Sequence, residues 1–177
     1  MDSNLTIRPV TPNDTAGILA IYTPEVKTGT ASWEYEVPSL EEMAQRIEKN
    51  LMDGYPWIVA EQNDLLIGYA YASSFRPRIG YRFCVENSIY LAPEARRTGV
   101  GKSLMESLIQ QCTDLGFRQM IAVIGDSDNT PSIRFHQNLG FKDAGTLKSA
   151  GFKNGRWLDS VNMQLELGDG DRTIPDH

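Results

Sequence analysis

The chain has 177 residues, 41% of them hydrophobic and 23% charged, which suits a single soluble globular domain with a hydrophobic core. No apolar run approaches the roughly 20 residues of a membrane span, and MDSNLTIRP at the start carries no secretory signal, so we expect no membrane partner. A formal net charge of -6 argues against general nucleic-acid binding. Two locally basic stretches, 75–83 and 94–102, indicate small anionic ligands instead.

The cysteines exclude some chemistry. Cys84 and Cys112 fit neither a metal-ligand spacing nor a disulfide framework, so we expect no metal and a reducing, cytoplasmic location. A cysteine nucleophile would need a histidine partner, and the chain offers only His136 and His177. We do not favour that reading.

A strand and a capped helix are predicted first. LTIRPV (5–10) is typical of a short strand. Thr11 then suits an N-cap, with Pro12 at the first helical position and Asp14 at the third. Apolar residues recur at helical spacing as far as Tyr22, which predicts a helix over this stretch.

The next segment predicts a second helix and two strands. SLEE is typical of a capping box, with Ser39 as the N-cap and Glu42 three residues later as its reciprocal partner. Gly54 should end the helix. Its apolar face should consist of Leu40, Met43, Ile47 and Leu51. PWIVAE and LLIGYAYAS are strand-like runs separated by the turn residues QND.

The second half continues the alternation. CVENSIYL predicts a strand, KSLMESLIQQCTDLG a helix closed by Gly116, MIAVIG a strand, and TPSIRFHQNLG a short helix. Strands follow near FKDAGTL and WLDSVNMQLEL, and the polar tail GDGDRTIPDH should fray. The order βααβββαβαββ predicts a mixed sheet with flanking helices. The three central strands should be antiparallel, and the step from Ser88 to Gly125 a right-handed parallel crossover.

A glycine-bearing loop follows the CVENSIYL strand. GVGKS resembles the end of an ATP-binding P-loop, but the first glycine of that motif would fall at position 96, which is arginine. RRTGVG (96–101) instead matches [QR]-x-x-G-x-[GA]. It leads into a helix N-terminus, where free N–H groups and the helix dipole bind anions. Arg97 and Lys102 add positive charge. A pyrophosphate is the expected ligand, although such a loop could also simply start a helix.

A second motif lies about thirty residues downstream. NTPSIRFHQNLGF (129–141) resembles the N-x-x-[AS]-x-x-x-[YH]-x-x-x-G-F signature of the GNAT superfamily of N-acetyltransferases. YPWIVAE, GYAYAS, FRPR, VENSIYL, GFRQMIAVIGDSDN and GFKNGRWLD resemble its phosphinothricin acetyltransferase branch. The resemblance runs from about residue 7 to residue 167. It implies the α/β GNAT fold for a domain of residues 1–167, followed by a tail of residues 168–177.

The resemblance implies acetyl-CoA as co-substrate and a homodimer with the substrate site near the interface. Backbone groups on the strand would meet the thioester, the loop would hold the pyrophosphate, and the 129–141 motif would contact the pantetheine arm. The implied cofactor-binding residues are Ile89, Tyr90, Leu91, Arg96, Arg97, Thr98, Gly99, Val100, Gly101, Lys102, Asn129 and Ser132.

Two residues are implied as catalytic. Acetyl transfer needs a neutral amine and hence a base, which the family places at Glu86. Even spacing in a strand puts Glu86, Ser88 and Tyr90 on one sheet face. His136 occupies the position where many GNAT enzymes have tyrosine, and it could protonate the leaving thiolate or orient the substrate. Glu86 could instead form a structural salt bridge, and His136 could instead pack for structure.

The basic stretch FRPRIGYRF should bind the substrate. Arginines pair with carboxylate or phosphinate oxygens, so the resemblance implies a small acidic amine such as phosphinothricin, methionine sulfoximine or methionine sulfone. The loop could also simply be solvated. The expected substrate residues are Trp33, Arg76, Arg78, Ile79, Gly80, Tyr81, Arg82, Glu86, Asn87 and Ser88, with Tyr35, Phe83, Lys153 and Arg156 as further candidates.

Other functions remain open. A GNAT enzyme could acetylate protein N-termini, lysines or another small amine. The domain could also be a non-catalytic acetyl-CoA sensor. The RPR loop argues against a peptide groove, and the presence of both Glu86 and His136 argues against a sensor.

Overall fold

The computed structural model describes residues 5–175, and its elements follow the predicted order. They are β1 (Leu5–Pro9), α1 (Thr15–Lys27), α2 (Leu40–Met52), β2 (Trp57–Gln62), β3 (Leu65–Ser74), β4 (Cys84–Leu91), α3 (Val100–Asp114), β5 (Gln119–Gly125), α4 (Thr130–Asn138), β6 (Lys142–Lys153) and β7 (Arg156–Glu166). Short 3-10 turns precede α1, β4 and α3, at Pro12–Asp14, Ile79–Tyr81 and Pro93–Ala95. No helix within this range has the length and apolar character needed to cross a membrane.

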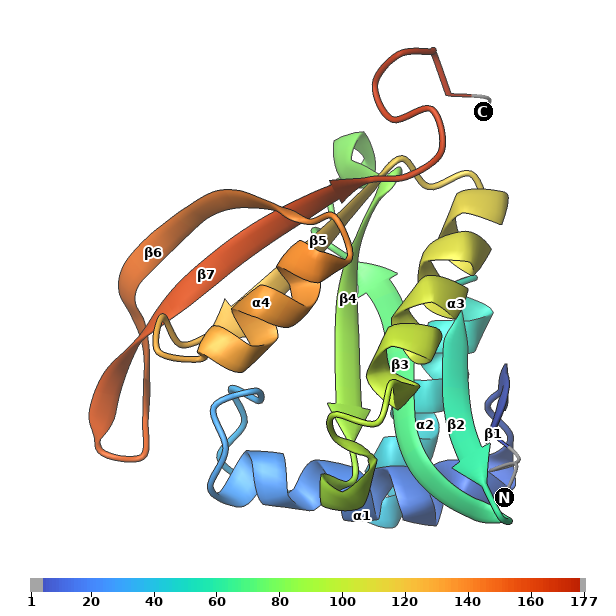
Figure 1. Ribbon diagram of the computed structural model, residues 1–177, viewed down its shortest axis with the longest axis vertical. Coiled ribbons are helices and arrows are strands. Elements are labelled where there is room, and N and C mark those ends of the chain that lie inside the picture. Colours follow the sequence, from blue (N-terminus) through green and yellow to red (C-terminus); the bar gives the residue numbers. More distant parts are fainter. Residues whose placement is uncertain (1–4, 176–177) are drawn as a thin grey trace.

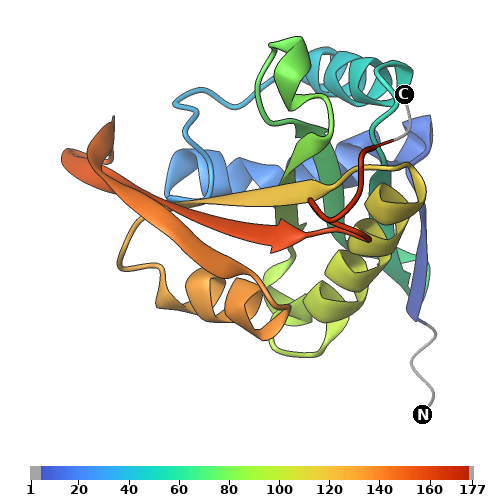
Figure 2. The same ribbon diagram turned by 90° about the horizontal axis from the view of Figure 1, so that it is seen from above.

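The strands form one mixed sheet in the order β1-β2-β3-β4-β5-β7-β6. β2, β3 and β4 pair antiparallel, and β4 pairs with β5 in parallel, which confirms the predicted strand directions. Helices α1 and α2 cover one face and α3 and α4 the other, as Figure 2 shows. The β6–β7 hairpin projects beyond the rest of the sheet (Figure 1).

Each face of the sheet has its own apolar core. The α3 side buries residues such as Leu104, Met105 and Leu108, which the amphipathic pattern of α3 predicts. The α1–α2 side is smaller and aromatic, with Trp57, Tyr69 and Tyr71 stacked across β2 and β3. The α3-side core continues across the centre of the sheet through Val85 of β4 and Met120 of β5, both fully buried.

Several sequence expectations need correction. The first turn capped by Thr11 is a 3-10 turn, and α1 begins only at Thr15. On α2, Met43 and Ile47 are buried, but Leu40 and Leu51 are exposed because only the middle of the helix meets the sheet. β6 extends to Lys153, so GFKNGRW forms a hairpin tip.

The C-terminal tail was predicted to fray, but hydrogen bonds hold it as far as Thr173. Its turns include a bond from the Gly170 N–H to the Leu167 carbonyl. Arg118 donates to Thr173 at 3.0 Å and lies 3.7 Å from Asp169. These bonds hold the tail against the start of β5. Residues 176–177 lie outside the described residues.

Candidate active site

The centre of the site is the point where two parallel strands separate. β4 and β5 are paired from Cys84 opposite Gln119 to Asn87 opposite Ala122, and then β4 stays with β3 while β5 stays with β7. A cavity of about 60 Å³ lies in this gap, lined by the second half of β4, the end of β5 and α4. Ile89 and Tyr90 lie on its wall, so backbone groups of β4 face an open space, as the predicted thioester site requires.

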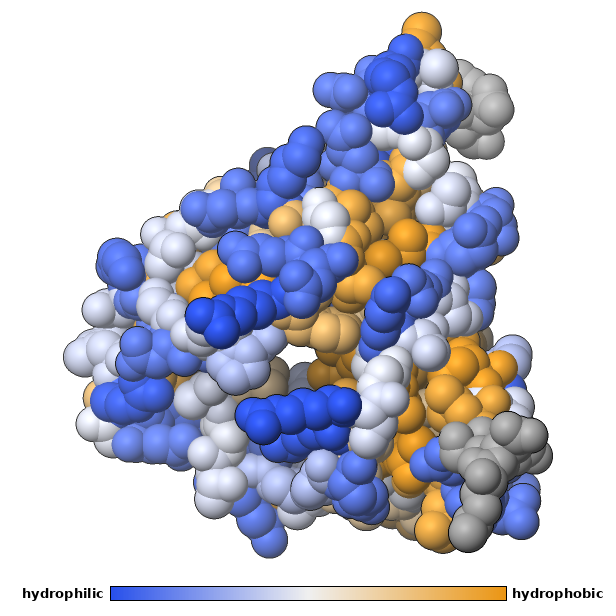
Figure 3. Space-filling model, viewed as in Figure 1, coloured by the Kyte–Doolittle hydropathy of each residue, from blue (hydrophilic) through white to orange (hydrophobic). Residues whose placement is uncertain are grey.

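A larger cavity of about 930 Å³ continues from the gap towards the glycine loop. Its lining includes Leu91, Arg96, Arg97, Asn129 and Ser132, five of the residues expected to bind the cofactor. The other wall is the end of α1 and the loop that follows it. Figure 3 shows the molecule hollowed between α4 and α1.

The glycine loop has the geometry of an anion site. Gly99 is the N-cap of α3 with φ of 95°, a left-handed conformation that side chains disfavour. The first backbone bond of the helix runs from Ser103 N to Gly99 O at 3.1 Å, so the preceding three N–H groups are available to an anion. Gly101 plays another part, because a Cβ there would lie 3.1 Å from Leu91 Cδ1. It lets α3 pack closely on β4.

The charged side chains of the loop divide between two tasks. Arg97 is exposed at the cavity mouth and has a positive φ of 63°. Lys102 is exposed and lies 3.7 Å from Glu106. Arg96 turns towards α1, where its Nη2 lies 3.0 Å from Glu25 Oε1. The loop therefore fits a pyrophosphate, but Arg96 is already paired with the carboxylate of Glu25, which no local sequence pattern indicates.

Glu86 lies on the sheet face that α1 and α2 cover. Tyr90, on the same face, stacks on Tyr69 and meets Tyr22 edge to face, both at 5.2 Å between ring centres. Glu86 is half-buried, and burial raises the pKa of its carboxyl group. Within residues 5–175 no cation forms an ion pair with it. Glu86 therefore forms no salt bridge with any described residue, which argues against the purely structural alternative.

His136 lies on the opposite face of the sheet, on α4. It is buried, with Nδ1 2.9 Å from the Ser132 carbonyl and Nε2 3.2 Å from Asn87 Oδ1. The Asn87 side chain therefore points away from Glu86 and Ser88, although all three were expected to contact the substrate. Asn129 caps α4 by accepting a bond from the Ser132 N–H at 3.3 Å, and it donates to the Gly125 carbonyl at 3.2 Å.

The predicted substrate loop lies between β3 and β4. Arg76 lies over the rings of Phe75 and Tyr81 at 5.1 and 5.4 Å, and Arg82 lies over Phe83 at 4.4 Å. Arg76, Arg78 and Arg82 are exposed, and none is in an ion pair with another described residue. Ile79 and Gly80 are exposed beside them in the 3-10 turn. The loop thus presents unpaired positive charge.

Trp33 belongs to the loop between α1 and α2, and its ring packs against Gly125 and Gly151, where no side chain is in the way. A Cβ at Gly151 would lie 2.0 Å from Trp33 Cζ3, and one at Gly125 would lie 3.0 Å from Cζ2. Tyr35 donates a hydrogen bond to the Phe152 carbonyl. Both aromatic residues therefore tie the α1–α2 loop to the β6–β7 hairpin, in addition to any contact with a substrate.

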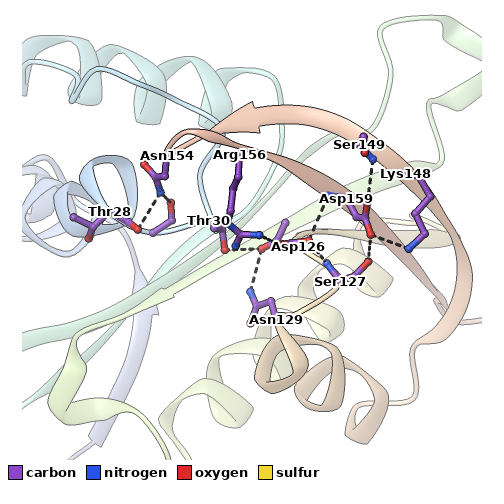
Figure 4. A network of polar contacts seen from close by, with 12 residues as sticks. Thr28, Thr30, Asp126, Ser127, Asn129, Lys148, Ser149, Asn154, Arg156 and Asp159 are labelled. Atoms are coloured by element: carbon purple, nitrogen blue, oxygen red, sulfur yellow. Dashed lines mark hydrogen bonds and ion pairs between the residues drawn. The ribbon is translucent and has the colours of Figure 1, made fainter.

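Lys153 and Arg156 are further substrate candidates, and both side chains form hydrogen bonds within the protein. Lys153 is buried and donates from Nζ to the Glu25 carbonyl at 3.0 Å and to the Ser32 carbonyl. Arg156 Nη1 lies 2.5 Å from Asp126 Oδ2, in the network of Figure 4 that also joins Asp159, Ser127 and Lys148. Both side chains therefore help to hold the hairpin in place, and Arg156 also lines the larger cavity.

The sequence carries a signal for this hairpin in its turn residues. Asn154 and Gly155 form its two-residue turn with φ of 52° and 74°, and an Asn-Gly pair between strands is a strong hairpin signal. Nothing in the local pattern indicated that Lys153 is buried.

The thiols are unsuited to nucleophilic catalysis. Cys84 and Cys112 are both free. Burial raises the pKa of Cys112 to about 12, and burial together with Glu86 raises that of Cys84. Both thiols are therefore protonated at neutral pH. Among residues 5–175 no group of three or more His, Cys, Asp or Glu side chains could hold a metal ion.

The fold and the open gap beside a helix N-terminus define an acetyltransferase of the GNAT type. The acetyltransferase (GNAT) domain family matches residues 7–162, and the chain belongs to this family. Its sequence is 49% identical to a phosphinothricin N-acetyltransferase of Alcaligenes faecalis, over 97% of this chain and 87% of that protein. It is 36% identical to an L-methionine sulfoximine/L-methionine sulfone acetyltransferase of Salmonella typhimurium, over 92% and 95%.

A solved structure gives the same assignment. A GNAT superfamily phosphinothricin acetyltransferase from Sinorhizobium meliloti, in complex with acetyl-CoA, superposes with a TM-score of 0.94 and 48% identity, covering 98% of this chain and 94% of that one. Within the GNAT family the chain thus falls in the phosphinothricin/methionine sulfoximine acetyltransferase branch and is an amino-acid N-acetyltransferase.

Proposed function

We propose that this protein transfers an acetyl group from acetyl-CoA to the α-amine of a small acidic amino acid of the phosphinothricin, methionine sulfoximine or methionine sulfone type. Glu86 is the general base. The observation that carries the proposal is a half-buried carboxylate with a raised pKa and no cationic partner among the described residues, on the strand that borders the gap.

The residues around the two cavities suit acetyl-CoA. The N–H groups of Val100, Gly101 and Lys102 hold the pyrophosphate together with Arg97, and Asn129 and Ser132 contact the pantetheine arm from α4. When bound, acetyl-CoA supplies the activated acetyl group. A backbone N–H at Ile89 or Tyr90 holds the negative charge that develops on the thioester oxygen.

Glu86 takes the proton that the substrate ammonium must lose, directly or through a water molecule. A carboxylate with a raised pKa is a stronger base than an ordinary glutamate, which favours this transfer. The arginines of the 75–83 loop pair with the acidic groups of the substrate. His136 serves the leaving thiolate from the other face of the sheet.

The base assignment is tested by Glu86→Gln. Acetyl-CoA turnover should fall by about 10²- to 10⁴-fold because the proton acceptor is lost, while acetyl-CoA binding measured by calorimetry should stay the same. Glu48→Gln, an exposed glutamate of α2, is the matched control and should keep full activity. Full turnover in Glu86→Gln would contradict the assignment.

The pH profile gives a second test of the base. Glu86 must be ionised to accept a proton, so kcat/KM should rise with pH through the raised pKa of this group. The acidic limb should therefore lie above pH 4.5, the ordinary pKa of glutamate. A limb at or below that value would oppose a buried base.

The substrate class is tested by an amine panel. Thiol release from acetyl-CoA should be confined to L-phosphinothricin, L-methionine sulfoximine and methionine sulfone. Glutamate, polyamines and a lysine peptide are the comparisons. Activity on the peptide or polyamines would support the alternative GNAT substrates, and acetyl-CoA binding without any turnover would support a sensor.

We further propose that residues 1–167 act as one catalytic domain within a homodimer. Exposed apolar side chains on the hairpin, Leu147, Phe152 and Trp157, are consistent with a protein contact beside the substrate site. Light scattering should give twice the monomer mass, and a monomer alone at micromolar concentration would rule the dimer out.

A further inference from the structure

Asn87 and His136 meet on the wall of the small cavity where β4 and β5 separate. Asn87 belongs to β4 and His136 to α4, and both residues line that cavity. His136 is 3% exposed and Asn87 is 6% exposed. The rings of Phe135 and Phe141 enclose the imidazole edge to face, with centres at 5.2 and 5.0 Å. The polar atoms of this pair are therefore shielded from bulk water except through the cavity that they line.

The hydrogen-bond partners determine where protons lie. Nδ1 of His136 faces the Ser132 carbonyl at 2.9 Å, and a carbonyl only accepts, so Nδ1 carries a hydrogen. The Asn87 amide donates from Nδ2 to the Ile121 carbonyl at 3.1 Å, which turns Oδ1 towards His136. Nε2 therefore lies 3.2 Å from an acceptor.

A neutral imidazole cannot complete this set of bonds. With the hydrogen on Nδ1, the lone pair of Nε2 would face the lone pairs of Asn87 Oδ1. Turning the amide over would place Oδ1 against the Ile121 carbonyl and create the same conflict there. Only a hydrogen on Nε2 as well lets every polar atom of the group bond.

We propose that Asn87 is a positioning residue that holds a proton on Nε2 of His136, at the cavity wall, for delivery to the coenzyme A thiolate. The inference rests on the proposed acetyl transfer. As the amide C–N bond forms, the C–S bond breaks and sulfur keeps its electron pair. The Nε2 proton passes to sulfur and leaves neutral imidazole. The nitrogen loses two protons, one before attack and one as the amide forms; Glu86 passes both in turn to solvent, and solvent returns one to His136.

The surroundings of His136 make the Asn87 oxygen decisive. The pKa of His136 lies below its ordinary value of 6.5, because burial lowers it by more than the hydrogen bond to the Ser132 carbonyl raises it, and no charged side chain of the described residues contributes. Arg134 of the same helix is exposed, and Glu86 of β4 lies on the other face of the sheet. β5 presents only apolar residues to this cavity, from Ala122 to Gly125. An acceptor at Asn87 thus opposes the effect of burial.

Nuclear magnetic resonance tests the pairing without any activity. The chain has two histidines, so His177→Gln leaves a single imidazole whose ring nitrogens can be titrated. Nδ1 should stay protonated throughout, and only Nε2 should titrate. Asn87→Asp should raise the midpoint by about one to three pH units because an anion replaces the amide, and Asn87→Leu should lower it.

Asn63→Asp is the matched control, since it adds the same charge in the exposed β2–β3 turn and should leave the midpoint unchanged. The same midpoint in wild type, Asn87→Asp and Asn87→Leu, or a titrating Nδ1, would overturn the pairing. If Asn87→Leu does not fold, the opposite shift expected for Asn87→Asp still decides the question.

Kinetics test the proton transfer. His136→Gln should lower kcat by about 10²- to 10⁴-fold with little change in the KM for acetyl-CoA. The alkaline limb of kcat should move up in pH in Asn87→Asp and down in Asn87→Leu. Unchanged kcat in His136→Gln would overturn the donor role. If no amine is turned over by the wild type, the acetyl-transfer proposal fails, while the titration still reports whether Asn87 sets the protonation of His136.

Discussion

At the scale of single residues, the Asp14 carboxylate accepts several short hydrogen bonds near the N-terminus. Arg8 donates to both of its carboxylate oxygens at 2.8 Å, and the Thr11 N–H donates at 2.7 Å. The guanidinium of Arg8 is the main cause that holds the pKa of Asp14 below its ordinary value of 3.8. This contact joins β1 to the turn that starts α1.

Asp14→Asn should therefore destabilise the fold by about 1–3 kcal/mol at neutral pH. Because the pKa is depressed in the folded state, the stabilisation is present above pH 3.8 and is lost as the pH falls through the lower folded value. Urea unfolding of wild type and variant should thus converge in acid. Asp64→Asn, in the exposed β2–β3 turn, is the control and should shift stability by less than about 0.5 kcal/mol.

At the scale of elements, the β6–β7 hairpin acts as a support for the α1–α2 loop. The Lys153 ammonium bonds carbonyls at both ends of the segment between Glu25 and Ser32. Asn154 donates to the Thr28 carbonyl at 3.2 Å, and Thr30 donates to the Gly125 carbonyl at 2.9 Å (Figure 4). The loop that carries Trp33 is therefore fixed from the far end of the chain.

Lys153→Met keeps the length and apolar stem of the side chain but removes its donors. The fold should lose about 1–3 kcal/mol, because the buried Ser32 carbonyl and the part-buried Glu25 carbonyl lose their partner. Hydrogen exchange should quicken in residues 28–35 and stay unchanged in α2. Lys142→Met, an exposed lysine of the same strand, is the control. Equal exchange of residues 28–35 in both variants would show that the hairpin does not hold the loop.

The same hairpin shows where sequence reasoning stops. The helices, strands and their order could be predicted because caps such as Ser39 and apolar periodicity act within a few residues. The glycine loop followed from a motif that is also local, and the thioester site beside it was implied by the family resemblance. The burial of Lys153 and the pairing of Asn87 with His136 depend on partners 121 and 49 residues away. No local pattern records such contacts, so the structure was needed to find them.

At the scale of the whole molecule, the charge distribution separates the substrate loop from the rest of the surface. The protein carries a net charge of -6, yet Arg76, Arg78 and Arg82 are exposed together without ion-pair partners among residues 5–175. An acidic molecule repels anions except where such a patch attracts them, and salt screens the attraction over about 8–10 Å. An acidic amino acid should therefore be drawn to this loop.

Replacing these arginines by glutamine should raise the KM for the acidic amine and leave kcat nearly unchanged, because the charges bind the substrate in its ground and transition states alike. Loss of one bidentate pair should cost roughly tenfold in kcat/KM, which corresponds to about 1.4 kcal/mol. At saturating acetyl-CoA, kcat/KM of the wild type should fall with added salt, and this dependence should flatten in the triple variant. Arg172→Gln, exposed near the C-terminus, changes the charge elsewhere and should keep the wild-type salt response. If KM changes neither with salt nor when the loop arginines are replaced, the acidic groups of the substrate do not bind at this loop.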